Sequence, residues 1–429
     1  METTLNQRTN VQQRRELEQL DSTQLSAYQL GRFNYLLDAI LPTNKFYQDK
    51  LGDVQRPLQS LGEVSELPFT TKDELIGEGS TSGFASNLSY APDQYTRFHR
   101  TSGTKGQPMV VLDTPQDWQW WLEGWQYVLD AAQLDASDRV VMAFSFGPFI
   151  GFWRAFDAVV ERGAMVAPTG AMSTLARLEL ISAIQATTIF CTPSYAIHMA
   201  QVGIENKFEL GSLAVNKIIV AGEPGGSIDS IRAQIENAWQ AKVIDHSGAT
   251  EVGPWGFGDP AGRGIYVNQA QFFPEFHSIE TGQPAGEGEL SELILTTLGR
   301  TGSPVIRYRT GDLVIPNWAD NQPSNFVLLQ GGVLGRTDDM MIIRGVNVFP
   351  TSVERILREF PEIAEYRLTA YKESSMDQLQ IEIEDELEDP QRVKQRLELQ
   401  LGFRIDVKCV AAGSLPRFEA KGKRFIDNR

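Results

Sequence analysis

The sequence is poor in the residues that metal centres and disulfide frameworks require. Its 429 residues include only four histidines and two cysteines, Cys191 and Cys409. Two cysteines cannot build a disulfide framework, and the sequence has no CxxC or HExxH arrangement that would hold zinc. We therefore expect both cysteines to behave as small buried apolar residues.

Positive charge is also scarce. Lys and Arg number 39 against 55 Asp and Glu, which gives a formal net charge of -16. Such a chain opposes any sequence-independent hold on nucleic-acid phosphate or on anionic lipid. We expect no nucleic-acid partner, and any polyanion must bind at a local site that carries its own cations.

Long apolar runs are missing too. No stretch approaches the roughly 20 apolar residues that a membrane helix needs. Residues 1–20 have no apolar core followed by a cleavage site. The sequence therefore predicts no membrane partner and a cytoplasmic location.

What is present is the composition of a folded protein. Hydrophobic residues make up 41% of the chain and charged residues 22%, enough apolar side chains to offset the entropy of ordering. A chain of this length is expected to form more than one packing unit.

The order of sequence patterns predicts an α/β fold. One packing helix is expected over residues 17–40, where leucines recur at helical spacing before Pro42. Short β-rich runs then alternate with helix-like segments, which favours a mostly parallel sheet with helices on both faces. The expected strands are 140–144, 165–168, 188–191, 218–221 and 243–245, and the expected helices are 152–162, 174–185 and 228–239.

The last third of the chain reads differently. Residues 282–316 are turn-rich and predict a smaller distorted sheet or barrel, with the Arg307–Asp312 run ending in a turn. After Gly335 a βαββαβ pattern predicts a small mobile α+β domain. We place the boundary so that residues 1–335 form the body and residues 336–429 form the C-terminal domain.

The strongest local motif is a loop in which hydroxyl side chains alternate with glycines. Such a loop offers hydroxyl and backbone N–H donors to phosphate oxygens. The P-loop and Rossmann glycine patterns are absent, which counts against those two nucleotide-binding classes. The loop consists of Thr101, Ser102, Gly103, Thr104, Lys105, Gly106, Gln107 and Pro108.

Further motifs follow in a fixed order, and two of them come directly after expected strands, where ligand crevices of open α/β sheets form. Together with the loop, they resemble the core motifs of the adenylate-forming superfamily. The segments 303–312 and 344–350 resemble its phenylacetate-CoA ligase branch in particular. These motifs span residues 221–224, 247–251, 309–312, 335–339 and 421–424.

The resemblance implies an AMP-forming acid–thiol ligase that uses ATP, Mg²⁺ and coenzyme A. An aromatic carboxylic acid, phenylacetate-like or benzoate-like, would attack the α-phosphate of ATP to give an acyl-adenylate and pyrophosphate. A thiol, normally that of coenzyme A, would then displace AMP.

Carried over residue by residue, the resemblance assigns three catalytic residues, namely Thr101, Glu251 and Lys421. Glu251 would also be the magnesium carboxylate, and Lys421 would bridge the nascent carboxylate and the α-phosphate. The family usually has Lys where Gln107 stands, so Lys105 would supply that cation. The phosphate loop is Ser102, Gly103, Thr104, Lys105 and Gly106.

The resemblance also implies a nucleotide site. Asp312 would accept the ribose hydroxyls and Arg336 would contact the ribose or phosphate region. Ser247 stands where relatives usually carry a Tyr that stacks on adenine, so the stacking must come from elsewhere or be weaker. The remaining nucleotide-binding residues implied are Gly222, Glu223, Pro224, Gly248, Ala249, Thr250 and Asn347.

Three further roles are implied. Asp338 would be the hinge of the C-terminal domain, and Arg344 and Gly345 would line the coenzyme A path. The acid pocket would include Phe144, Phe146, Phe149 and Trp153, although aromatic side chains at one helix start are as often core as ligand wall.

Two alternatives remain open from the sequence. The acyl group could pass to the phosphopantetheine thiol of a carrier protein, or the chain could be a non-catalytic acyl- or nucleotide-binding regulator. A homodimer is a further expectation, since relatives often dimerise.

Overall fold

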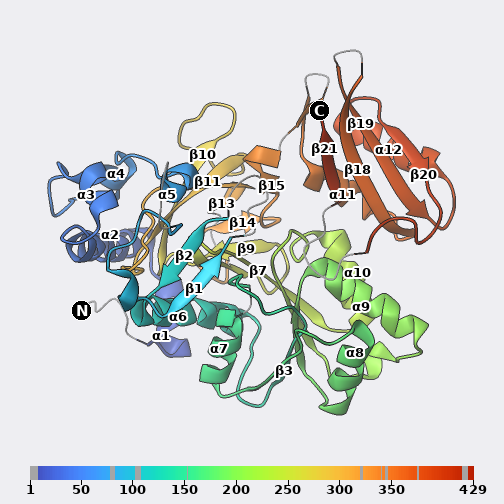
Figure 1. The fold of residues 1–429 in the computed structure, drawn as a ribbon, viewed down its shortest axis with the longest axis horizontal. Helices are drawn as coiled ribbons and strands as arrows, with labels where there is room; N and C mark the ends of the chain where they lie inside the picture. The colour runs from blue at the N-terminus through green and yellow to red at the C-terminus, as the bar shows by residue number, and fades with distance from the viewer. Residues whose placement is uncertain are drawn as a thin grey trace.

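The computed structural model describes residues 8–77, 83–101, 108–151, 153–318, 322–339, 341–343, 346–373, 376–417 and 424–429. Figure 1 shows a large body beside a smaller orange and red unit that holds the C-terminal residues. The expected α/β body and separate α+β unit are therefore confirmed. In the part of the chain described, no helix combines the length and apolar character needed to cross a bilayer.

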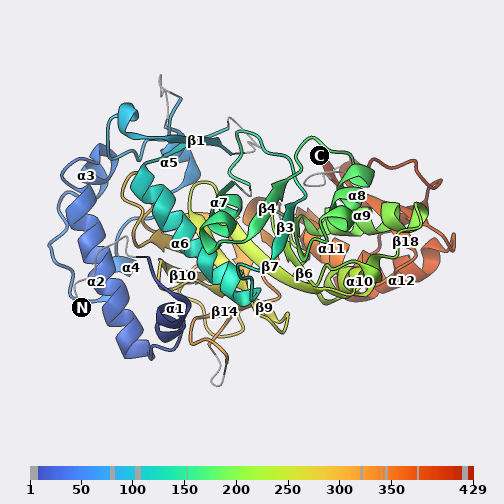
Figure 2. The ribbon, with the colours of Figure 1, turned by 90° about the horizontal axis from the view of Figure 1, so that it is seen from below.

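The first helical region consists of two helices, α1 (Val11–Glu18) and α2 (Ser22–Ile40), and not of the single helix expected from residue 17. The break occurs because Asp21 caps α2. Its carboxylate accepts the Gln24 N–H at 2.8 Å, and the Gln24 side chain accepts the Asp21 N–H at 3.1 Å. Helix α2 lies at the end of the molecule opposite the C-terminal unit, as Figures 1 and 2 show.

Short elements then lead into the body. Helix α6 is capped by Thr114, has Pro115 at its first position and is almost entirely buried. The β1–β2 hairpin precedes it, so the ends of the glycine- and hydroxyl-rich loop are held by antiparallel strands. The elements are α3 (Lys45–Leu51), α4 (Leu61–Ser65), α5 (Lys72–Ile76), η1 (Pro92–Gln94), β1 (Arg97–Arg100), β2 (Val110–Asp113) and α6 (Pro115–Ala131).

The main sheet has nine strands in the order β13-β14-β9-β8-β7-β6-β5-β3-β4. Strands β3 to β7 are parallel, whereas β7 pairs antiparallel with β8, and the remaining pairs are antiparallel as well. The strands are β3 (Arg139–Met142), β4 (Met165–Pro168), β5 (Thr188–Cys191), β6 (Lys217–Val220), β7 (Lys242–Ala249), β8 (Gly253–Gly258), β9 (Gly264–Val267), β13 (Pro316–Asn317) and β14 (Leu328–Gln330).

All five expected strands of this region are present, with two changes at their ends. Strand β3 stops at Met142, and β7 continues through Ala249, four residues beyond its expected end. Helices α7 (Trp153–Arg162), α8 (Thr174–Ala183) and α10 (Asp229–Trp239) match the expected segments, whereas α9 (Pro193–Glu205) and the short η2 (Leu210–Ser212) were not expected.

Alternation along the parallel strands buries both faces of the sheet. Val140, Phe190 and Ile219 pack in one core with side chains of α6 and α7. Val141 and Ile218 point the other way, into a second core with α8, α9 and α10. Cys191 belongs to that second core and is fully buried, as expected, whereas Cys409 is only partly buried.

The smaller sheet of the body is four-stranded and antiparallel, in the order β10-β11-β12-β15. Strand β12 runs through the segment that was expected to end in a turn, and it pairs with β15. The strands are β10 (Phe272–Ser278), β11 (Ser291–Thr297), β12 (Tyr308–Val314) and β15 (Gly335–Arg336), and the short helix η3 (Thr337–Asp339) follows.

The C-terminal unit has its own hydrophobic core, drawn from residues 341–407 with Cys409 and Phe425 packed against it. A β16–β17 hairpin precedes a four-stranded sheet in the order β20-β19-β18-β21. The final strand β21 was not expected. The elements are β16 (Met341–Ile343), β17 (Val346–Val348), α11 (Pro350–Leu357), β18 (Ile363–Glu373), β19 (Met376–Asp385), α12 (Pro390–Leu401), β20 (Asp406–Cys409) and β21 (Phe425–Asn428).

Candidate active site

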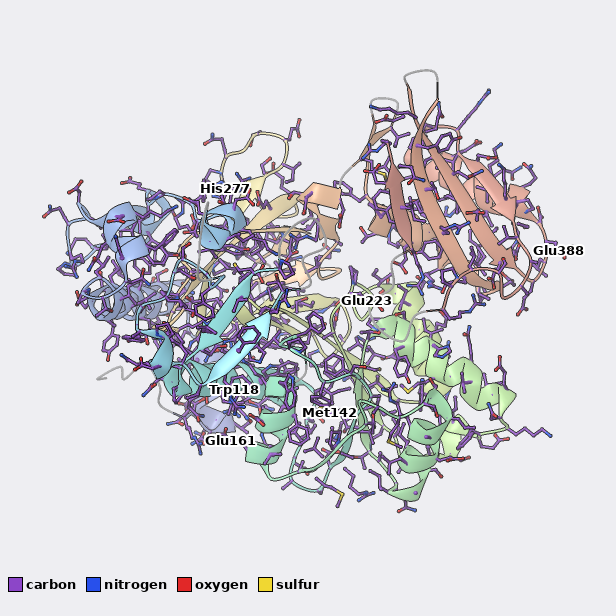
Figure 3. The ribbon with its side chains drawn as sticks, viewed as in Figure 1. Trp118, Met142, Glu161, Glu223, His277 and Glu388 are labelled. Atoms are coloured by element: carbon purple, nitrogen blue, oxygen red, sulfur yellow. The ribbon has the colours of Figure 1, made fainter. Side chains whose placement is uncertain are left out.

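Two adjoining cavities lie at the carboxyl ends of the parallel strands. The larger has a volume of about 750 Å³ and is walled by the body. The smaller, of about 290 Å³, lies between the body and the C-terminal unit. Gly222, His246, Gly248, Ala249 and Arg336 line both, so the two cavities meet along the end of β7. Figure 3 labels Glu223 on the edge of the body that faces the C-terminal unit.

The start of the hydroxyl-rich loop opens into the larger cavity. Thr101 follows β1 and is held by Met109 at the other end of the loop. Its N–H donates to the Met109 carbonyl at 2.9 Å, and its hydroxyl accepts the Met109 N–H at 3.0 Å. Thr101 and Arg100 both line the larger cavity. Thr101 and Met109, which flank the loop, are therefore bonded to each other, and Thr101 lies on the wall of the cleft.

The motif at residues 247–251 begins inside β7, because the strand runs on past the last residue that pairs with β6. Ser247 pairs with Gly256 and Ala249 pairs with Gly253, with a bulge between the two pairs. A Cβ on Gly248 would lie 2.9 Å from the Gly253 carbonyl oxygen, so only glycine fits this close approach. The bulge turns residues 248–251 toward the cavities.

Glu251 has two side-chain partners at the cleft. Its carboxylate accepts a hydrogen bond from the Tyr308 hydroxyl at 3.1 Å, and Lys72 Nζ lies 3.7 Å away. Burial, reinforced by the negative charge of Glu251, raises the pKa of Tyr308, so the phenol stays a neutral donor. Thr250 and Lys72 line the larger cavity beside Glu251.

A buried ionic cluster fixes the backbone at this position. Arg300 donates two hydrogen bonds to Asp113, at 2.7 and 3.0 Å, and a third to the Glu251 carbonyl oxygen at 2.7 Å. Arg154 also pairs with Asp113, and its guanidinium carbon lies 3.0 Å from the centroid of the Trp121 ring. Burial alone would raise the pKa of Asp113, but the charges of Arg154 and Arg300 hold it below its ordinary value.

Asp312 and Arg336 face each other across strands β12 and β15. Arg336 Nη1 donates to Asp312 Oδ1 at 2.9 Å and its Nε donates to Asp338 at 3.2 Å. Asp312 therefore lies in a strand beside a cation and not in the turn that the sequence suggested. Asp338 lies in η3 and lines the larger cavity, whereas Asp312 lines the smaller one.

The loop after β6 forms another wall of the smaller cavity. Gly222 has a φ of 94°, a conformation that favours glycine. Glu223 accepts the Ser194 N–H at 2.8 Å, which ties this loop to the start of α9. Pro224 and Ser247 line the same cavity.

The four aromatic residues expected at the acid pocket do not all line the cavity. Phe144 and Phe149 line it. Phe146 packs behind them, with ring centroids 5.7 Å from Phe144 and 4.7 Å from Trp153. The Trp153 indole donates to the Gly147 carbonyl at 2.9 Å and so closes the segment on itself.

Several cavity residues were not singled out from the sequence. Trp121 and Trp125 come from α6, and His246 comes from the middle of β7. A helix rich in tryptophan is equally typical of a core, and a histidine inside a buried strand carries no positional signal. The C-terminal unit adds further residues to the smaller cavity, namely Pro350, Thr351, Glu354, Tyr366, Leu368, Arg424 and Phe425.

Other expected site residues cannot be placed in this way. Asn347 pairs through its backbone with Ile342 in the β16–β17 hairpin, and its side chain lies outside the description. The following expected residues lie wholly outside the described ranges: Ser102, Gly103, Thr104, Lys105, Gly106, Arg344, Gly345 and Lys421.

Comparisons with known proteins identify the family. Residues 345–429 match the model of the AMP-binding enzyme C-terminal domain. The phenylacetate-coenzyme A ligase of Escherichia coli strain K12 is 30% identical over 435 residues, which cover 96% of this chain and 97% of that protein. The chain belongs to the phenylacetate-coenzyme A ligase family of adenylate-forming enzymes.

Solved structures of one relative, a 2-hydroxyisobutyryl-CoA ligase, match the chain in two states at 25% identity. In the postadenylation state with 2-HIB-AMP the TM-score is 0.90, over 100% of this chain and 95% of the relative. In the thioesterification state with 2-HIB-AMP and CoA it falls to 0.73 over the same coverage. The C-terminal unit therefore sits against the body as it does in the postadenylation state of that ligase.

The stability of the ligase is expected to fall in weak acid because of His246. Burial lowers its pKa to about 4, against about 6.5 in an unfolded chain, while the bond to Gly256 acts in the opposite direction. The unfolded state thus binds the proton first, so stability is fully present above pH 6.5 and is lost as the pH falls toward 4.

At about 1.4 kcal/mol per unit of pKa shift, this loss amounts to roughly 3 kcal/mol. Urea unfolding of the wild type and of His246→Gln at intervals from pH 7 to pH 4 measures it. The wild type should lose more free energy of unfolding than the variant across this range. If the free energies of unfolding of the two proteins fall in parallel with pH, His246 does not cause the loss of stability.

Proposed function

We propose that this member of the family activates an aromatic carboxylic acid with ATP and then transfers the acyl group to the thiol of coenzyme A. One observation carries the proposal. A cavity of about 290 Å³ that bears Asp312 adjoins an aromatic-walled cavity, and Glu251 lies beside their common border. The arrangement suits a reaction between a phosphate group and an apolar acid.

The first step joins two anions, and alignment and positive charge lower its barrier. The carboxylate oxygen attacks the α-phosphorus, and the bond to pyrophosphate breaks. The loop after Thr101 would hold the β- and γ-phosphates, with Lys105, Lys72 and Arg100 as nearby cations. Lys421 would neutralise the charge that builds up between the carboxylate and the α-phosphate.

The nucleotide would lie along the end of β7 in the smaller cavity. Asp312 would accept the ribose hydroxyls, with Arg336 fixing its carboxylate. The loop of Gly222, Glu223 and Pro224 would lie beside the adenine. Because Ser247 offers no ring, the aromatic side chains that line this cavity, Trp255, Tyr366 and Phe425, are the candidates to pack on the base.

Magnesium fits this site as a metal shared with the substrate. Among the described residues no three His, Cys, Asp or Glu side chains gather to hold an ion. Glu251 supplies one carboxylate oxygen ligand at the cleft. Proteins usually bind Mg²⁺ through one or two carboxylates when substrate phosphates supply other ligands. When bound, the ion would neutralise phosphate charge.

The class of acid follows from the relatives and from the cavity wall. The Escherichia coli relative is a phenylacetate-coenzyme A ligase. Trp121, Trp125, Phe144 and Phe149 give the larger cavity flat apolar surfaces of the kind that a benzene ring packs on. Phe146 and Trp153 would support these walls from behind.

In the second step the thiol displaces AMP after the C-terminal domain turns. Asp338 would be the hinge, residues 1–335 and 336–429 the two bodies, and Arg344 and Gly345 would line the thiol path. Coenzyme A is the proposed acceptor. The carrier-protein acceptor, the homodimer and the cytoplasmic location stay predictions, which an acceptor comparison, gel filtration and cell fractionation would test.

Removing the charge of Glu251 should impair adenylation. In Glu251→Gln we expect acid-dependent pyrophosphate release to fall at least about 10²-fold, because an oriented charged group at the phosphates is lost. Raising the magnesium concentration should recover part of the rate. Glu287→Gln, on an exposed turn, is the matched control and should keep wild-type activity. Full activity of Glu251→Gln would rule out the metal role.

Lys421→Ala should separate the two half-reactions. Pyrophosphate release should be abolished, whereas thioester formation from supplied acyl-adenylate and coenzyme A should be largely kept, since that step needs no charge at the α-phosphate of ATP. Lys408→Ala is the control, because Lys408 lies exposed on β20. An equal loss of both activities would argue against the assigned role.

Asp338→Pro should show the opposite separation. Proline fixes φ near -65° and removes an N–H, so rotation about this position is restricted. We expect pyrophosphate release to persist and thioester formation from supplied acyl-adenylate to slow at least about tenfold. If both steps keep their rates, the hinge lies elsewhere.

A further inference from the structure

His246 brings a polar ring to a largely apolar part of the larger cavity. It is 6% exposed and lines both cavities. Its ring centroid lies 4.0 Å from that of Trp125, which lines the larger cavity together with Phe144 and Ile150. The imidazole is therefore part of the wall against which the acid would pack.

The hydrogen bond on the far side of the ring fixes the tautomer. His246 Nδ1 lies 2.7 Å from the carbonyl oxygen of Gly256. A carbonyl oxygen can only accept, so Nδ1 carries the hydrogen and Nε2 presents a lone pair. Burial lowers the pKa of His246 to about 4, so at neutral pH the ring keeps this form.

Nε2 is open toward the cavities. Nε2 has no hydrogen-bond partner among the described residues. It is also absent from the set of fully buried polar atoms without a partner, so this nitrogen is not completely buried. A Cβ built on Gly248, which lines both cavities, would lie 3.3 Å from this nitrogen. The cleft thus holds an oriented acceptor that no described side chain satisfies.

We propose that Nε2 of His246 accepts a hydrogen bond from an O–H or N–H group of the acid, so that the ligase selects hydroxy- or amino-substituted aromatic acids. The inference rests on the proposed function and refines its substrate class. His246 lies where the two cavities meet, so the donor belongs near the carboxyl end of the acid, at the ortho or α position. The adenine amino group is the other donor that could reach this border.

The acid is favoured over adenine by the surroundings of the ring. Trp125, which packs on His246, lines the larger cavity, and the apolar residues that adjoin it come from the same wall. An acid without a donor would leave the buried acceptor unsatisfied once water is displaced, and that carries a free-energy penalty. The ligase should therefore discriminate against acids that carry no donor.

The test compares matched acids in pyrophosphate release by the full-length enzyme. One set is benzoate, 2-hydroxybenzoate and 2-methoxybenzoate, and the other is phenylacetate, mandelate and α-methoxyphenylacetate. The methoxy acids keep the oxygen but carry no donor, and the unsubstituted acids control for the added methyl group. We expect kcat/KM to be at least about tenfold higher for the hydroxy acid of the preferred set.

Two variants assign this preference to the residue. His246→Leu should lower kcat/KM more for the hydroxy acid than for the unsubstituted acid, so that the preference is lost, and His246→Gln, whose side-chain oxygen can replace Nε2, should restore part of it. An ATP analogue that lacks the adenine amino group should leave the preference for hydroxy acids unchanged.

The outcomes separate this inference from the proposed function. If acids are activated but the wild type does not prefer the hydroxy acid, the inference is wrong and the ligase function stands, whether or not the variants fold. A preference that survives in His246→Leu also overturns it. A KM effect of the variants on ATP alone would assign the acceptor to adenine. If no acid in either set is activated, the proposed function fails and the inference fails with it.

Discussion

The change of pairing along β7 is the constraint on which the site depends. The first half of the strand continues the parallel sheet beside β6, and its second half pairs antiparallel with β8. Parallel neighbours end at Asp245, so the residues beyond it extend past the sheet edge, where ligands of α/β proteins bind. His246, Gly248 and Glu251 all follow this point; His246 and Gly248 line both cavities, and Glu251 lines the larger one.

A buried ionic cluster holds the end of this strand in place. Arg300 joins Asp113 at the end of β2 to the carbonyl oxygen of Glu251. Removing Asp113 would leave the like charges of Arg154 and Arg300 buried without the carboxylate they share, which costs several kcal/mol. The cluster therefore fixes the β1–β2 hairpin and the Glu251 segment relative to each other, although Asp113 and Glu251 are 138 positions apart in the chain.

The sequence was informative where a pattern is local and much less so where partners are distant. Short β-rich runs and the helix-like segments between them identified β3 to β6 and α7, α8 and α10 within a few residues. The extension of β7 to Ala249 could not be predicted, because it depends on pairing with β8 through a bulge. The break at Asp21 was visible as a capping residue followed by Gln24, but the regular leucine spacing concealed it. His246 could not be recognised as a cavity residue, since only the bond to Gly256 and the ring of Trp125 give its nitrogens distinct roles.

The smaller cavity also shows why the position of the C-terminal unit matters. One wall comes from the body, and the other comes from α11, β18 and β21. Arg424, which lies on that wall, pairs with Glu365 at 2.5 Å, and the β21 strand that follows it pairs with β18. A rotation of the unit would carry this wall away from Gly222 and Ser247. Because each unit supplies one wall of the smaller cavity, a displacement of the C-terminal unit from the body would open it, whereas the larger cavity, lined by residues between Thr71 and Asp338, would keep its walls.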